Sequence, residues 1–163
     1  MKLRKGFTLV ELLIVIVIIG VLAAAMLLAS GAATASAEAS NIVSNLRSLQ
    51  SASLMFYADN MDELMDPNSG VTFDIDDLVQ YTNNPDAPVW AAYTFTFGLG
   101  GGGVAPLADE SWWISAPVTR TDVGTRLQGR AASVGLFNDD TDTASTNWYT
   151  GGVGQVFMLV RNP

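Results

Sequence analysis

The pattern of hydrophobic and polar positions divides the chain into a long apolar block, an amphipathic stretch and a mixed C-terminal part. Residues 12–29 are 18 consecutive positions without a polar side chain. At about 1.5 Å per residue, a helix of that length spans roughly 27 Å, close to the thickness of a bilayer's hydrocarbon core. Three cations precede the block: Lys2, Arg4 and Lys5. The pattern predicts a membrane-spanning helix whose basic end stays in the cytoplasm, with everything after Ser30 outside.

The amphipathic stretch begins at Glu38. Its apolar positions recur at steps of three and four, as on one face of a helix: Ile42, Leu46, Leu49, then Ser53 and Phe56 or Tyr57, widened by Ala39, Val43 and Leu54. We expect this face to pack on a folded domain and the polar positions to face out: Asn41, Asn45, Arg47 and Gln50. Because no proline lies between Phe7 and Pro67, the pattern predicts one helix from Phe7 to about Asn60. Its 54 residues would be about 80 Å long.

Shorter elements are predicted in the C-terminal part. Asp74 can cap a helix over residues 75–81, and a second helix starts at Thr121 or Asp122. That second helix carries apolar residues at helical spacing: Val123, Leu127, Ala131 and Val134. Strands are predicted over residues 89–97, 111–118 and 155–160. The pattern therefore favours an α+β fold, in which the amphipathic half of the long helix packs on a small antiparallel β-sheet. The sequence does not indicate the order of the strands in this sheet.

Glu11 is the one charge at the start of the apolar block. Three interpretations of the N-terminal stretch differ in how they account for this charge. A secretory signal would be cleaved near Ala35-Ser36-Ala37, but this apolar stretch exceeds an h-region of about 7–15 residues. A plain membrane anchor leaves Glu11 as a carboxylate in lipid, at a cost of roughly 2.5–3.5 kcal/mol. Cleavage after Gly6 would instead give Phe7 a new α-amino cation, one helical turn from Glu11.

Residues 5–15, Lys-Gly-Phe-Thr-Leu-Val-Glu-Leu-Leu-Ile-Val, resemble the class III signal of type IV pilins and of the pseudopilins of type II secretion systems. The resemblance covers about the first 30 residues. It implies that a membrane peptidase cuts after Gly6 on the cytoplasmic side and methylates the new N-terminus at Phe7. It also implies an inner-membrane assembly platform and a homo-oligomeric helical filament of bundled N-terminal helices. In that filament Glu11 would neutralise the Phe7 amine of an adjacent subunit.

The resemblance implies four regions of the chain. Residues 1–6 are a leader, residues 7–30 a transmembrane and filament-core helix, residues 31–60 its amphipathic continuation, and residues 61–163 a globular α+β head. The chain differs from many type IV pilins because its apolar half contains no proline. If the helix loosens locally in a filament, the loosening would have to use Gly20 or residues 30–37.

Composition narrows the classes of function. The net charge of −8 includes 13 acidic and 4 basic residues within residues 61–163, which argues against a phosphate-binding face, so we expect no nucleic acid. The chain has no cysteine and no histidine, which excludes disulfides and the usual zinc sites. A glycine-rich run at residues 98–103 precedes a proline and is interpreted as a hairpin loop. No side-chain arrangement suggests nucleophilic catalysis, so we expect a protein that is not an enzyme.

Asp139, Asp140 and Asp142 are crowded into a predicted loop. Carboxylates in such loops can bind calcium, and the resemblance adds weight because major pseudopilins often carry calcium near the C-terminus. A solvated acidic turn is the alternative interpretation.

Three roles stay open at this point. The chain could be a subunit of a surface type IV pilus, a periplasmic pseudopilin of a type II secretion system, or a minor tip-located pilin that binds a ligand. The absence of cysteines slightly favours the role of a pseudopilin. In each case we expect a single-pass protein of the inner membrane before assembly and an extracytoplasmic filament afterwards.

Overall fold

The computed structural model describes residues 6–66, 74–97, 111–139 and 148–161. Two compact units divide the chain, Met1–Ala35 and Ser36–Pro163. One long helix, α1 (Leu9–Asp59), contributes to both units. The predicted long helix is therefore confirmed, with a start two residues later and an end one residue earlier than expected. The predicted loosening near Gly20 or residues 30–37 concerns an assembled filament, and it stays a prediction.

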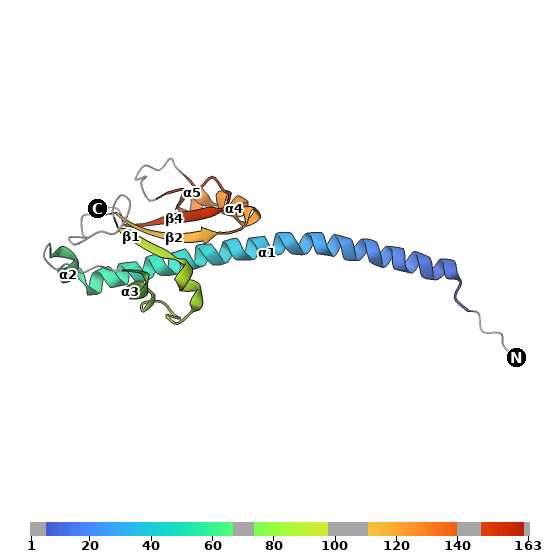
Figure 1. Ribbon diagram of the computed structural model, residues 1–163, viewed down its shortest axis with the longest axis horizontal. Helices are drawn as coiled ribbons and strands as arrows, with labels where there is room; N and C mark the ends of the chain where they lie inside the picture. Colours follow the sequence, from blue (N-terminus) through green and yellow to red (C-terminus); the bar gives the residue numbers. More distant parts are fainter. Residues whose placement is uncertain (1–5, 67–73, 98–110, 140–147, 162–163) are drawn as a thin grey trace. The chain divides into compact units, whose positions relative to one another are not determined.

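The C-terminal part of α1 packs against the sheet of the second unit (Figure 1). The buried positions follow the predicted stripe: Ala39, Ile42, Leu46, Leu49, Ala52, Ser53 and Phe56. Leu54 was expected in this stripe and is instead 50% exposed. Asn45 and Gln50 were expected to face out, but they lie beside the stripe and reach the head. The Asn45 amide donates to the Tyr93 hydroxyl at 3.0 Å, and the Gln50 amide donates to the Leu159 carbonyl at 3.0 Å.

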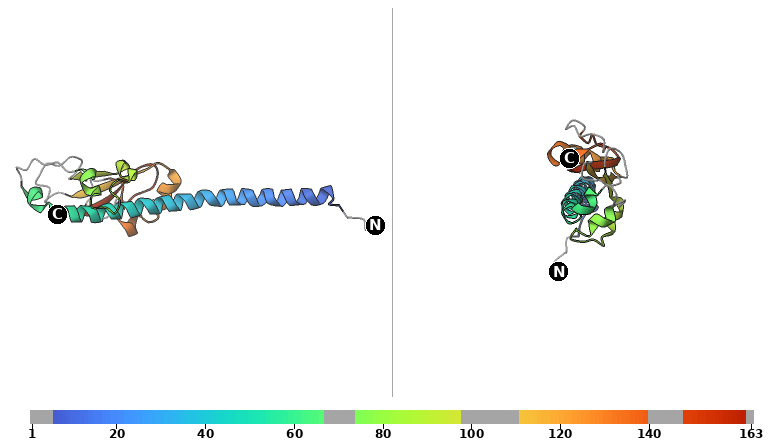
Figure 2. Two further views of the ribbon diagram at one scale, coloured as in Figure 1. Left: turned by 90° about the horizontal axis from the view of Figure 1, so that it is seen from below. Right: turned by 90° about the vertical axis from the view of Figure 1, so that its left-hand side faces the viewer.

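The sheet has four antiparallel strands in the order β1-β2-β4-β3. Its strands are β1 (Thr94–Phe97), β2 (Trp112–Val118), β3 (Leu136–Phe137) and β4 (Gly154–Arg161). β2 and β4 pair along their whole lengths in the centre, and all but one residue of β2 are buried. The end-on view in Figure 2 shows the sheet on one side of α1, with α3 (Ile75–Val79) on another.

Four further short helices complete the described chain: α2 (Met61–Met65), η1 (Pro88–Ala92), α4 (Thr121–Gln128) and α5 (Ala131–Val134). The predicted cap of α3 is confirmed, because the Asp74 carboxylate accepts from the Asp76 amide at 2.8 Å. In α2 the structure has a helix where the sequence indicated only a linker.

Three shorter predicted elements differ in extent by two residues or more. The helix expected over residues 75–81 ends at Val79. The strand expected over residues 89–97 begins only at Thr94, because Pro88 starts the 3₁₀ turn of η1. The helix expected to continue to Val134 ends at Gln128, and the chain turns at Gly129 and Arg130 before α5 begins. Its N-cap is Arg120 rather than Thr121 or Asp122, and no side chain caps it. Strand β3 follows at once and was not predicted.

Aromatic side chains fill much of the core between α1 and the sheet. Trp112 and Trp113 are fully buried and Trp90 is nearly so, so these three indoles are core residues. The Trp112 ring meets Tyr57 of α1 edge-on, with ring centroids 5.4 Å apart. Such pairs contribute roughly 0.5–1.5 kcal/mol beyond their buried area. They fix the sheet on the amphipathic half of the helix.

Asn138 joins the two ends of the segment that runs from β3 to Trp148. Its side-chain amide donates to the Trp148 carbonyl at 3.2 Å, and its carbonyl oxygen accepts from the Thr150 amide at 3.0 Å. The rings of Phe137 and Trp148 stack nearby, with centroids 5.0 Å apart. In a chain without cysteine, these contacts hold together two ends that a disulfide could otherwise join.

We expect Asn138→Ala to lower the free energy of unfolding by about 1–2 kcal/mol, because two backbone groups lose their partner. The measurement is thermal unfolding of the full chain in detergent, where the Tm should fall by about 5–10 °C. Asn83→Ala is the matched control, since Asn83 is exposed and makes no side-chain hydrogen bond to any residue that the structure describes. Equal stability of the two variants would contradict the role of Asn138.

Candidate processing and assembly site

The start of α1 is organised by Thr8 and Glu11. The Glu11 carboxylate accepts from the Thr8 backbone amide at 2.8 Å and from the Thr8 hydroxyl at 2.7 Å. The Glu11 amide in turn donates to the Thr8 hydroxyl oxygen at 3.2 Å. Reciprocal bonds between an N-cap threonine and a glutamate three residues later form a capping box. Two of the amides that a helix start leaves without partners are thereby satisfied.

This role of Thr8 was not predicted. The signal was present in the sequence, since Thr8-Leu9-Val10-Glu11 has the Thr-x-x-Glu spacing of a capping box directly before an apolar run. The cap also explains why the helix begins at Leu9 rather than at Phe7.

Gly6 and Phe7 lie just before the helix and are exposed; Phe7 exposes 91% of its surface. A Cβ atom placed on Gly6 would meet no heavy atom within 4 Å. Packing against the described residues therefore does not require a glycine there. The peptide bond between these two residues is outside the regular hydrogen bonding of α1.

The apolar part of α1 packs against no other described segment of its unit. Its large side chains from Leu9 to Leu27 for which burial is described expose between 49% and 80% of their surface. Gly20 likewise has open space around its Cα. By length and composition, α1 could cross a membrane, with a mean hydropathy of 3.2 in its most apolar window. An exposed apolar surface of this extent indicates contact with lipid or with other protein.

The calcium prediction cannot be followed through the loop, since Asp140 and Asp142 lie outside the described residues. Asp139 is partly buried. Within the described ranges, no three carboxylate, histidine or cysteine side chains gather closely enough to hold a metal ion. The calcium site at Asp139, Asp140 and Asp142 stays a prediction.

Residues 1–27 match the family model described as the prokaryotic N-terminal methylation motif. The chain thus carries the class III prepilin signal of type IV pilins and pseudopilins, as the resemblance implied. Proteins with this motif are structural subunits that a prepilin peptidase processes. Searches of curated proteins and of solved structures found no match to the chain.

Proposed function

We propose that this chain is a structural subunit of a type IV pilus or pilus-like filament. It would be matured by cleavage after Gly6 and methylation of Phe7, and assembled by bundling of the N-terminal helices. The observation that carries the proposal is the methylation motif at residues 1–27, placed on an apolar helix whose large side chains have no partners in their own unit.

The same surface of α1 would contact the membrane before assembly and other subunits in the filament afterwards. Before assembly, the side chains of residues 9–27 face lipid. After assembly, they face the equivalent helices of other copies. Full burial of one such side chain from water is worth about 1.5–3 kcal/mol, so the segment is stable only in one of these two apolar surroundings. Gly20 and the nearby alanines would allow close helix contacts.

Processing would act on the short extended stretch before the helix. The capping box keeps Gly6 and Phe7 outside α1, where a peptidase can bind them in extended form. Because nothing in the described part of the chain requires a glycine at position 6, the requirement would come from the active site of that peptidase. Inner-membrane assembly proteins would then receive the matured subunit.

Glu11 would change partners during this sequence. In the uncut chain its carboxylate is bonded to the amide and hydroxyl of Thr8. Cleavage creates an amine on Phe7, and that cation attracts the same carboxylate. A carboxylate and an amine in lipid are both costly unless paired, so pairing between adjacent copies would set their register.

Mass spectrometry of the mature N-terminus tests the proposal. We expect a chain that begins at Phe7 and carries the mass of one added methyl group, recovered in filaments sheared from cells or from the periplasm. Cleavage after Ala37 would identify an ordinary secretory signal. An uncut N-terminus in the assembled material would contradict maturation after Gly6.

A further inference from the structure

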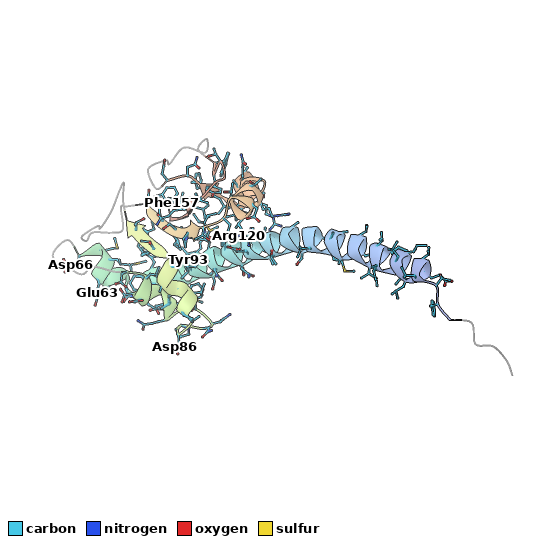
Figure 3. All side chains as sticks on the ribbon, turned by 45° about the vertical axis from the view of Figure 1, so that its right-hand side comes forward. Glu63, Asp66, Asp86, Tyr93, Arg120 and Phe157 are labelled. Carbon is cyan, nitrogen blue, oxygen red and sulfur yellow. The ribbon has the colours of Figure 1, made fainter. Side chains whose placement is uncertain are left out.

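A groove of about 260 Å³ lies on one flank of the head-bound part of α1. Its apolar walls come from Ile42, Val89, Ala92 and Pro117, and its polar groups from α1 are Glu38, Asn41 and Asn45. Tyr93 also lines the groove, and its hydroxyl oxygen accepts the hydrogen bond from the Asn45 amide. Figure 3 labels Tyr93 and Arg120, which both lie beside this stretch of α1. Apolar walls around amide and carboxylate oxygens suit a long aliphatic side chain with a cationic end.

Glu38 lines the groove and belongs to a cluster of three charged side chains with a net charge of −1, Glu38, Arg120 and Asp122. Arg120 bonds the Glu38 carboxylate at 3.2 Å and also bonds Asp122, so one cation serves two carboxylates. The hydrogen bond from Arg120 is the main cause that lowers the pKa of Asp122. The Glu38 side chain keeps 38% of its surface exposed, which leaves room for a second cation beside it.

Two arginines of the second unit are exposed and make no hydrogen bond or ion pair with any part of the chain that the structure describes. They are Arg47 on α1 and Arg126 on α4. Arg47 comes nine residues after Glu38, and at 3.6 residues per turn these two positions lie on opposite sides of a helix. Arg47 therefore cannot enter the groove of its own chain. It can enter the groove of a second copy.

We propose that Arg47 of one copy inserts into the groove formed by Glu38, Asn41 and Tyr93 of the neighbouring copy. The two surfaces are different, so the contact is heterologous and can repeat without closing, which generates an open filament. The inference rests on the proposed function and names the head contact that accompanies the bundling of the apolar helices.

The spacing along α1 supports this contact. Pairing Glu11 of one copy with the Phe7 amine of the next requires a shift of four residues, about 6 Å along parallel helices. Placing Arg47 level with residues 38–45 of the next copy requires a shift of roughly 3–14 Å in the same direction. Counted in residues along the sequence of α1, the two shifts have the same direction and overlapping lengths.

A charge exchange in the full-length protein tests the pairing. Arg47→Glu should lower the yield of sheared filaments at least about tenfold, because a carboxylate then faces Glu38. Asn41→Lys should lower it similarly, since it places a cation of the same chain in the groove. The two changes together should restore assembly to within about threefold of the parent. Arg126→Glu is the matched control and should assemble normally.

Crosslinking gives a second readout, made simple by the absence of natural cysteines. Chains with Arg47→Cys and chains with Asn41→Cys are expressed together and treated with a short thiol-reactive crosslinker. We expect covalent dimers in the filament fraction, and none when Arg126→Cys replaces Arg47→Cys.

Each outcome separates this contact from the proposed function. Filaments with a methylated Phe7, normal assembly of Arg47→Glu and no crosslink would overturn the contact alone. A crosslink through position 126 instead of position 47 would also overturn it. If the chain without any substitution is never recovered in filaments, both the contact and the proposed function are overturned.

Discussion

Replacing Glu11 with alanine should leave the chain in the membrane, cut after Gly6, and almost absent from filaments. The amine created on Phe7 would then enter the apolar filament core without a partner. An unpaired charge in such surroundings costs roughly 2.5–3.5 kcal/mol, which corresponds to about a hundredfold loss of assembly per contact. The readouts are the sheared filament fraction, the membrane fraction and the mass of the mature N-terminus.

Glu11→Gln separates the charge of Glu11 from its role in the capping box. Glutamine at this position still accepts from the Thr8 amide, so the start of α1 is preserved. If pairing with the amine matters, this variant fails to assemble as severely as Glu11→Ala. Thr8→Ser keeps both the cap and the charge and should assemble normally. Abundant filaments from Glu11→Gln would show that the cap, rather than the charge, is what assembly requires.

Gly124→Ala should destabilise the head by about 2 kcal/mol, because the added methyl group collides with backbone. A Cβ atom on Gly124 would lie 2.1 Å from the Gly152 carbonyl oxygen. That oxygen also accepts a hydrogen bond of 2.9 Å from the Tyr149 hydroxyl, and Gly152 has a positive φ of 103°, so the loop has little freedom to retreat. Overpacking costs about 1–3 kcal/mol or more. The higher helix propensity of alanine offsets only about 1 kcal/mol of this cost.

Thermal unfolding of the full chain in detergent measures this effect, with an expected fall in Tm of about 10 °C. Gly129→Ala is the matched control, since its Cβ atom would approach no atom closer than 3.7 Å and its φ is −61°. That variant should unfold at the parental temperature or slightly above it. A Gly124→Ala protein as stable as the control would mean that α4 and the Gly152 loop can separate without loss.

The start of the chain encodes two features in local sequence, the capping box and the processing motif. Thr8 and Glu11 are three residues apart, so their hydrogen bonds depend only on local backbone geometry, and the spacing alone was sufficient to predict them. The motif around Gly6 and Phe7 was equally local, and the family match at residues 1–27 bears it out. For the same reason the helix expected over residues 75–81 formed with its predicted cap, although it ends at Val79.

Errors arose where distant residues decide the outcome. Asn45 and Gln50 are polar positions on a helix and were assigned to solvent, yet each finds its partner 48 and 109 residues further along the chain. Their bonds require the sheet to be in place. Strand β3 is only two residues long, and pairing with Phe157 and Met158 of β4 defines it rather than any pattern of its own.

The amino-acid sequence by itself determined the long helix, its apolar and amphipathic halves, and the processing motif at its start. These features depend on hydrophobic periodicity and on residues within one or two helical turns of each other. Only the tertiary structure decided the strand order, the close approach of Gly124 to Gly152, and the groove beside Glu38, into which we propose that Arg47 of a neighbour inserts. Each depends on residues far apart in the chain, whose meeting is governed by how the sheet packs on α1 and by no local preference.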